Sequence, residues 1–274
     1  IGVMMDKKKT LYMIGNAHLD IVWLWQWQEG CQEVKATFRS ALDRMKEYDD
    51  FFFTSSSAAH YEWVEENEPA MFEEIRERVK EGRWVIVGGW WMQPDCNAPG
   101  GESFVRQGLY GQRYFREKLG VTAHTGYNVD SFGHNGMLPQ ILKKQGMDNY
   151  VFMRPGRHEK GIESELFEWA SNDGSRVTAF RIPFEYCTWP DELKEHVLRC
   201  AGEIKGEEGS IMCFYGVGNH GGGPTKRNIE SIRELDKEED MPHLIMATPD
   251  DYFRDIKAQG KTLPVVSGEL FHHS

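Results

Sequence analysis

The sequence predicts an α/β fold with mostly parallel strands and one inserted β-hairpin. Short apolar runs alternate with longer charged, amphipathic runs along the 274 residues, which is the pattern of repeated βα units. No Ser/Gly/Pro-rich linker and no internal repeat interrupts this series. At this length the chain is one large domain or two small ones, and it is long enough to bury a sizeable core.

The apolar runs predict the strands, and the charged runs between them predict the helices. We expect strands over residues 10–18, 50–56, 83–89, 123–129, 149–153, 176–182, 210–218, 243–248 and 263–268. We expect helices over residues 28–47, 57–80, 102–118, 136–145, 190–205, 225–237 and 249–258. The stretches "GESF" and "TPDDYF" place Ser, Thr and Asp just ahead of two helices, where such side chains cap free N–H groups.

The stretch "ESELFEWASNDGSRVTAFRI", residues 163–182, differs from the βα series around it. The tripeptide "NDG" lies between two runs of alternating apolar and polar residues, which is a strong hairpin signal. We therefore expect a β-hairpin inserted at this point of the chain.

Composition excludes several classes of partner and of site. The 32 basic and 43 acidic residues give a net charge of −11, which disfavours nucleic acid because binding to it depends on neutralising phosphates. No apolar window of about 18 residues exists to span a bilayer, so we expect no membrane association and a cytoplasmic location. The five cysteines are scattered without a CxxC pair, so neither a disulfide framework nor a sulfur-rich zinc site is indicated.

Polar side chains follow four of the predicted strands, and these are the candidate functional residues. They are His18 and Asp20, then Asp130, Ser131 and His134, then Asn219 and His220, and last His272 and His273. In parallel sheets, catalytic and ligand-binding residues lie beyond the C-terminal ends of the strands. His18 and Asp20 are two residues apart in an extended segment, so both can reach one ion, and zinc takes imidazole and carboxylate together. The alternative for any single histidine here is a core residue with satisfied hydrogen bonds.

Two loops carry weaker signals. "GNHGGGPT" places three glycines between a strand and a helix, but it lacks the P-loop spacing, and the chain contains no GxGxxG, so a nucleotide site is disfavoured. The loop after residue 89 contains Trp90, Trp91, Gln93, Asp95 and Asn97, and it is either a sugar subsite or a polar loop with a buried Trp pair.

Taken together, the motifs resemble a known enzyme family. "NAHLDIVWLW", "YNVDSFGHNGMLPQILKKQGMDNYVFMRPG", "FEWASNDGSRV", "GVGNHGGGPT" and "LPVVSGELFHHS" are similar, in that order, to the N-terminal catalytic region of glycoside hydrolase family thirty-eight, the class II α-mannosidases. "PDCNAPGGESFVRQ" resembles the bacterial and cytosolic-like branch. The resemblance covers nearly the whole chain and implies a barrel-like β/α domain of the seven-stranded type.

The resemblance also implies a metal site and a nucleophile. Family members hold one zinc per chain, and the matching positions are His18, Asp20, Asp130 and a C-terminal histidine, for which we prefer His273 to His272. They are retaining enzymes in which the zinc-bound Asp of the second motif, here Asp130, is also the nucleophile.

Further roles follow from the same resemblance. Trp23 matches the residue that stacks on the sugar, whereas Trp25 is expected to begin a helix and pack into the core. Arg154 and Tyr186 are candidate substrate contacts, and ordinary packing is the alternative for Tyr186.

The acid/base residue departs from the family pattern. Many relatives have "GD" ahead of the glycine run, whereas this chain has Asn219, a candidate substrate contact, and His220. We take His220 as the tentative proton relay because its reference pKa of about 6.5 suits acid and base work. Asp95 and Glu185 are the alternatives.

The sequence thus predicts a zinc-dependent retaining α-mannosidase that acts on α-mannosides or mannose-containing oligosaccharides. Because family members continue with further domains, residues 1–274 are expected to be a single catalytic α/β domain from the N-terminal part of a longer chain. A metal-dependent carbohydrate deacetylase and an inactive mannose-binding paralogue are the alternatives, and an oligomer stays open.

Overall fold

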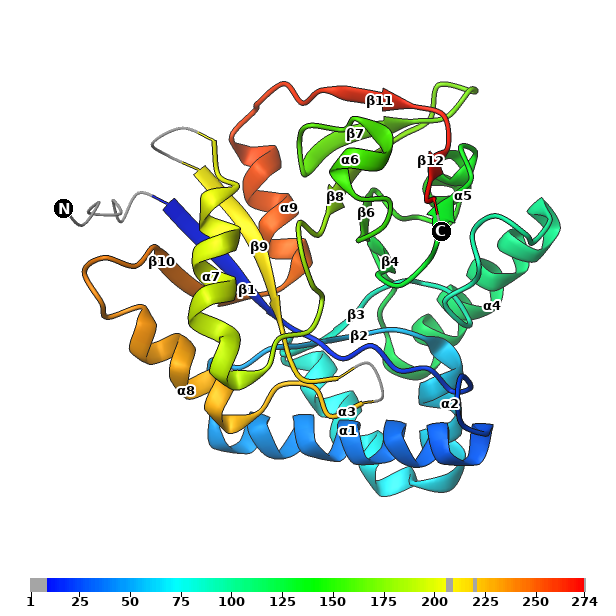
Figure 1. Ribbon diagram of the computed structural model, residues 1–274. Coiled ribbons are helices and arrows are strands. Elements are labelled where there is room, and N and C mark those ends of the chain that lie inside the picture. Colours follow the sequence, from blue (N-terminus) through cyan, green and yellow to red (C-terminus); the bar gives the residue numbers. More distant parts are fainter. Residues whose placement is uncertain (1–8, 206–208, 219–220, 274) are drawn as a thin grey trace. The chain divides into compact units, whose positions relative to one another are not determined.

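The computed structural model describes residues 9–205, 209–218 and 221–273 (Figure 1). The chain divides into two compact units, which are described separately. Unit 1 comprises Ile1–Thr54, Glu73–Val85 and Phe184–Tyr252, and unit 2 comprises Ser55–Phe72, Ile86–Pro183 and Phe253–Ser274.

Unit 1 contains a three-stranded parallel sheet in the order β10-β1-β9. The strands are β1 (Lys9–Gly15), β9 (Gly209–Tyr215) and β10 (His243–Ala247). Leu11, Met13 and Ile14 of the central strand are fully buried, in keeping with a parallel strand that is covered on both faces.

Three helices of unit 1 accompany this sheet. They are α1 (Trp27–Glu47), α7 (Leu193–Gly202), which follows the short 3₁₀ helix η1 (Pro190–Glu192), and α8 (Lys226–Leu235). Helix α7 packs against β1 and β9, and α8 packs against β10 (Figure 1). Thr225 begins α8 with a capping box, in which its hydroxyl accepts from the Asn228 N–H and the Asn228 side chain accepts from the Thr225 N–H.

Unit 2 contains a five-stranded sheet in the order β11-β7-β8-β6-β4. The strands are β4 (Thr125–Asn128), β6 (Asn149–Phe152), β7 (Leu166–Ala170), β8 (Arg176–Arg181) and β11 (Val265–Ser267). Neighbouring strands pair in parallel except β7 and β8, which are antiparallel. The turn between those two contains Gly174 at φ 87°, and Asp173 accepts the N–H of Ser175 at 3.0 Å.

The remaining elements of unit 2 surround a core rich in aromatic side chains that includes Trp90, Tyr150 and Trp169. The helices are α2 (Ala58–Asn67), α4 (Gly101–Leu119), α5 (Leu138–Lys144) and α6 (Arg157–Lys160), and α5 packs against β8. Two short strands, β5 (Gly133–His134) and β12 (Leu270–Phe271), form an antiparallel pair.

Four elements contain a point at which the chain passes from one unit to the other. They are β2 (Phe53–Ser55), β3 (Trp84–Ile86), α3 (Pro69–Lys80) and α9 (Pro249–Ala258). The predicted single helix over 57–80 is wrong, because the structure has α2 and α3 in its place. Glu68, at φ −136° and ψ 57°, lies outside the helical region because the ring of Pro69 disfavours a helical residue before it.

A mixed α/β fold with parallel sheets is confirmed, whereas closure into a seven-stranded barrel and the single-domain organisation stay predictions. Within the described part of the chain, no helix combines the length and the apolar character that crossing a membrane requires.

Candidate catalytic and metal-binding residues

The end of β1 is held in place by Asn16, which is buried. Its N–H donates to the Tyr215 carbonyl at 3.0 Å. Its side-chain amide donates to the carbonyls of Tyr186 and Tyr215 at 2.8 and 3.3 Å. Because a buried amide without partners is costly, these bonds fix where the chain leaves the sheet.

Gly216 allows the backbone to approach Asn16. A Cβ at this position would lie 2.3 Å from the Asn16 carbonyl oxygen, and its φ of 134° disfavours other residues. The glycine after β9 therefore makes room for the segment that carries His18.

His18 and Asp20 lie together in the segment after β1. The His18 side chain is buried and its Nε2 is 3.3 Å from Asp20 Oδ1, whereas the Asp20 side chain is 31% exposed. The Tyr186 ring meets the imidazole edge-on, with 5.3 Å between centroids. The pair thus presents one imidazole and one carboxylate, and a buried tyrosine limits how the imidazole can rotate.

Trp23 and Trp25 follow in the same loop of unit 1, and their rings contact each other. Trp25 Nε1 donates to the Asp20 carbonyl at 2.9 Å, and its ring meets Trp23 edge-on at 5.5 Å. Trp25 is only partly buried, so the expectation that it packs into the core is wrong: its N–H reaches back to the backbone of Asp20 instead. Trp23 is 60% exposed, which leaves its ring accessible to a ligand.

Gly30 lets helix α1 run against this loop. A Cβ at Gly30 would lie 2.1 Å from the Ile21 carbonyl oxygen, which is closer than any side chain tolerates. Gly30 was not among the predicted site residues, although a glycine inside a predicted helix is a signal of close backbone approach.

In unit 2, Asp130 and Arg154 come together because they follow neighbouring parallel strands. Each lies two residues beyond its strand, and Asn128 of β4 is in register with Phe152 of β6. Arg154 Nη1 donates to Asp130 Oδ1 at 2.5 Å. The guanidinium also lies 4.7 Å from the ring centroid of Phe132. Asp130 is therefore held by a cation that is itself stacked on an aromatic ring.

His134 proves to be a buried support for this pair. Its Nε2 donates to the Arg154 carbonyl at 2.8 Å, which leaves Nδ1 to accept the Tyr150 hydroxyl at 2.9 Å. Burial lowers the pKa of His134 to about 4, against the smaller effect of the bond to Arg154. It is thus a neutral core histidine, which is the alternative that the sequence left open.

The two C-terminal histidines have different surroundings in unit 2. His272 Nδ1 lies 2.8 Å from Glu159 Oε1, and the His273 N–H donates to the same oxygen at 2.8 Å. Burial opposes the charge of Glu159, but hydrogen bonds from the N–H groups of Gly156 and His273 and from His272 hold its pKa below the ordinary value. The His273 imidazole is exposed and contacts the Phe271 ring. Within the described residues, His273 belongs to no group of three potential ligand side chains.

The other predicted residues are placed as follows. Tyr186 is buried, Glu185 is exposed, and exposed Asp95 accepts the N–H groups of Asn97 and Ala98 at 2.7 and 2.9 Å in a turn. Trp90 belongs to the core of unit 2, which favours the polar-loop interpretation at that position. Asn219 and His220 lie outside the described residues.

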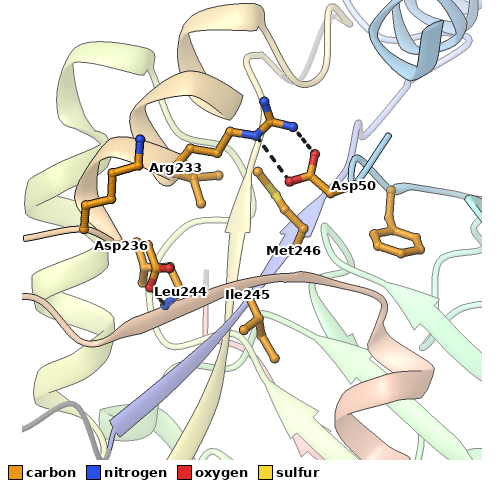
Figure 2. A pocket seen from close by; sticks show the side chains of 9 residues that line it. Asp50, Arg233, Asp236, Leu244, Ile245 and Met246 are labelled. Carbon is orange, nitrogen blue, oxygen red and sulfur yellow. Dashed lines mark hydrogen bonds and ion pairs between the residues drawn. The ribbon is translucent and has the colours of Figure 1, made fainter. Parts of the chain in front are cut away.

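Unit 1 also contains a pocket of about 440 Å³ beside β10 and α8 (Figure 2). Arg233 of α8 pairs with Asp50, and Asp236 accepts the Leu244 N–H at 2.8 Å. Its lining includes none of the residues to which the sequence assigns a role. The bond of Asp236 to Leu244 holds the end of α8 against β10, and Arg233 joins α8 to the segment before β2. We assign the pocket no function.

Histidine, carboxylate and arginine side chains beyond the C-terminal ends of parallel strands are typical of an enzyme site in an α/β fold. The chain belongs to glycosyl hydrolases family 38, because the model of that family's N-terminal domain matches residues 8–272. It is therefore a domain of a glycosidase family.

Three known proteins illustrate this membership. Alpha-mannosidase G of Dictyostelium discoideum is 30% identical over 268 residues, which are 97% of this chain and 25% of that protein. The crystal structure of an alpha-mannosidase from Enterococcus faecalis V583 has a TM-score of 0.77 at 20% identity, covering 96% of this chain and 31% of that one. A 4-alpha-glucanotransferase from Thermococcus litoralis shares the fold, with a TM-score of 0.63 at 18% identity, covering 95% of this chain and 40% of that one. The chain spans about a quarter of the length of the curated relatives it matches.

Replacing Asn16 tests how the end of β1 is held. Asn16→Ala leaves the Tyr186 and Tyr215 carbonyls without this donor, so the free energy of unfolding should fall by about 2 kcal/mol. Urea denaturation measures the change. The matched control is Asn67→Ala, where an exposed amide bonds only to its own helix and the change should stay within about 0.5 kcal/mol. Equal effects of the two substitutions would contradict the role of Asn16.

The buried His134 predicts a pH dependence of stability. Unfolded, this histidine takes up a proton near pH 6.5, but in the folded chain it does so only near pH 4. Its stabilising contribution is therefore complete above about pH 6.5 and is lost as the pH falls toward 4, roughly 3 kcal/mol in all. Urea denaturation at pH 7 and pH 4.5 should show a smaller pH dependence for His134→Gln than for the exposed-site control His124→Gln. An unchanged pH dependence in His134→Gln would show that His134 is not the titrating group.

Proposed function

We propose that this chain is the catalytic domain of a zinc-dependent retaining α-mannosidase. The observation that carries the proposal is the family match over residues 8–272, a range that contains every residue given a role except His273, which follows it directly. The mannosidase names of the relatives favour α-mannosides or mannose-containing oligosaccharides as substrates. We further propose a single domain within a longer cytoplasmic protein.

The residues present suit a zinc ion. Ligand atoms of one tetrahedral zinc lie about 2.0–2.2 Å from it and so roughly 3.4 Å from each other, close to the 3.3 Å between His18 Nε2 and Asp20 Oδ1. We propose that His18, Asp20, Asp130 and His273 would hold one zinc per chain. Such an ion supplies Lewis-acid chemistry and orients the sugar hydroxyls.

His273 is preferred to His272 on the contacts within unit 2. The His272 imidazole contacts Glu159, whose pKa is lowered. Glu159 is therefore an anion that competes with a metal ion for this imidazole. The exposed His273 side chain is anchored through its backbone N–H, which leaves its imidazole nitrogens for a ligand role.

Asp130 is proposed as the nucleophile. Its carboxylate would attack the anomeric carbon and form a glycosyl ester while the leaving oxygen takes up a proton, and water would then cleave the ester to restore the original anomer. Arg154 would fix the orientation of the carboxylate through the 2.5 Å bond. Trp23, with its exposed ring, would stack on the sugar.

The proton donor is proposed from the sequence alone. We propose His220 as the acid/base residue and Asn219 as a substrate contact. Among the alternatives, Asp95 has one oxygen occupied by its own turn, and Glu185 is exposed, so each retains an oxygen for proton transfer. Tyr186 packs on His18, and we propose that it orients the imidazole as well as facing the substrate.

Substituting Asp130 tests the proposed nucleophile. In the full-length protein, Asp130→Asn should lower kcat toward an aryl α-mannoside by a factor on the order of 10³ or more, because the amide cannot form the ester. The control is Asp148→Asn, an exposed carboxylate paired with Lys143, which should leave kcat within about twofold. Retention of most activity in Asp130→Asn would remove Asp130 as the nucleophile.

Product analysis separates the proposal from its alternatives. Proton NMR of the first product should show α-mannose, as a retaining enzyme requires. Initial β-mannose would contradict the double displacement. Acetate release from an N-acetylated sugar without glycosidic cleavage would favour a deacetylase, and stabilisation by mannose without turnover would favour a binding paralogue.

A further inference from the structure

A second group of potential metal ligands lies inside unit 1. His196 and Cys200 are four residues apart on α7 and so share one face of that helix, which packs against β9 and β1. Cys213 of β9 meets this face, and all three side chains are buried. The group shares no residue with the proposed catalytic set.

The separations match those of ligands to a single ion. His196 Nε2 and Cys200 Sγ are 3.8 Å apart, and one ligand atom from each of the three residues lies within 4.8 Å of the others. With zinc–sulfur bonds of about 2.3 Å and zinc–nitrogen bonds of about 2.0 Å, tetrahedral ligands are roughly 3.5–3.8 Å apart. Small side-chain adjustments are therefore sufficient for all three atoms to reach one centre.

We propose that His196, Cys200 and Cys213 form a structural zinc site that fastens α7 to β9. Two thiolates cancel the charge of a divalent ion and the imidazole is neutral, so the complex can be buried without net charge. The fourth tetrahedral position falls to a water molecule. Within the group His196 is 6% exposed, and the two cysteines are 0–1% exposed.

The two thiols differ in their surroundings. Cys213 and, after it, His196 hold the pKa of Cys200 below the ordinary thiol value despite burial. Burial raises the pKa of Cys213. Zinc binds thiolates, so its binding would release the remaining thiol protons.

The link would reinforce a helix that is already tied to the sheet at one end. Lys9 Nζ of β1 donates to the Ala201 and Ile204 carbonyls at the C-terminal end of α7, at 3.4 and 3.2 Å. Cys200 directly precedes Ala201 on this helix, and His196 lies about one turn earlier. Zinc would thus add a link between α7 and β9 to the one that Lys9 makes between α7 and β1.

Cobalt substitution tests the site independently of the mannosidase proposal, because the proposed catalytic ligands contain no sulfur. Full-length protein loaded with Co²⁺ should show a thiolate-to-cobalt charge-transfer band in the near ultraviolet. The band should be lost in Cys200→Ser and Cys213→Ser and weakened or shifted in His196→Gln. It should persist in Cys31→Ser, a buried cysteine of α1 outside the cluster, and in Asp20→Asn.

Absence of the band in the unsubstituted protein, or its persistence in Cys200→Ser, would overturn the proposal. If the serine variants do not fold, thiol protection in the unsubstituted protein decides. Under partial denaturation, zinc should slow alkylation of Cys200 and Cys213 at least tenfold, as mapped by mass spectrometry, and leave Cys31 unchanged. Equal labelling of these cysteines with and without zinc would refute the site.

Discussion

The way β1 ends is the constraint on which the candidate site of unit 1 depends. A strand covered on both faces must satisfy its polar groups where it leaves the sheet, and Asn16 does so by bonding to the carbonyls of Tyr186 and Tyr215. His18 and Asp20 follow within four residues, so their direction is set by that anchor. Trp25 then fixes the Asp20 backbone. The imidazole and carboxylate are thus positioned by backbone contacts of the segment that carries them.

In unit 2, the ends of two strands likewise position the candidate residues. Two parallel strands in register each continue for two residues, and this brings Arg154 next to Asp130. His134 supports Arg154 by a bond to its carbonyl. Burial keeps the imidazole neutral, so one ring nitrogen donates to Arg154 and the other accepts from Tyr150. A charged pair at the strand ends therefore depends on an uncharged histidine in the core.

The sequence predicted much of the fold, whereas the roles given to the site residues stay predictions. Periodicity located β1, β6, β8 and the helices α4, α8 and α9 because each is long or strongly patterned. It did not predict β5, β12 or α6, which are too short to carry a period, or the break that Pro69 imposes. The proximity of Cys200 to Cys213 was not predicted, because one residue lies on a helix face and the other on a strand. Their spacing in the sequence therefore resembles no metal motif. The bonds of His134 to Arg154 and Tyr150 also depend on tertiary contacts that local sequence does not encode.

We propose that His18, Asp20, Asp130 and His273 together hold one zinc. The most direct measurement is anomalous scattering at the zinc edge from crystals of the zinc-replete full-length protein. The account predicts a peak coordinated by these four side chains, in addition to any peak at Cys200 and Cys213. A zinc-replete crystal with no peak beside His18 and Asp130 would contradict it.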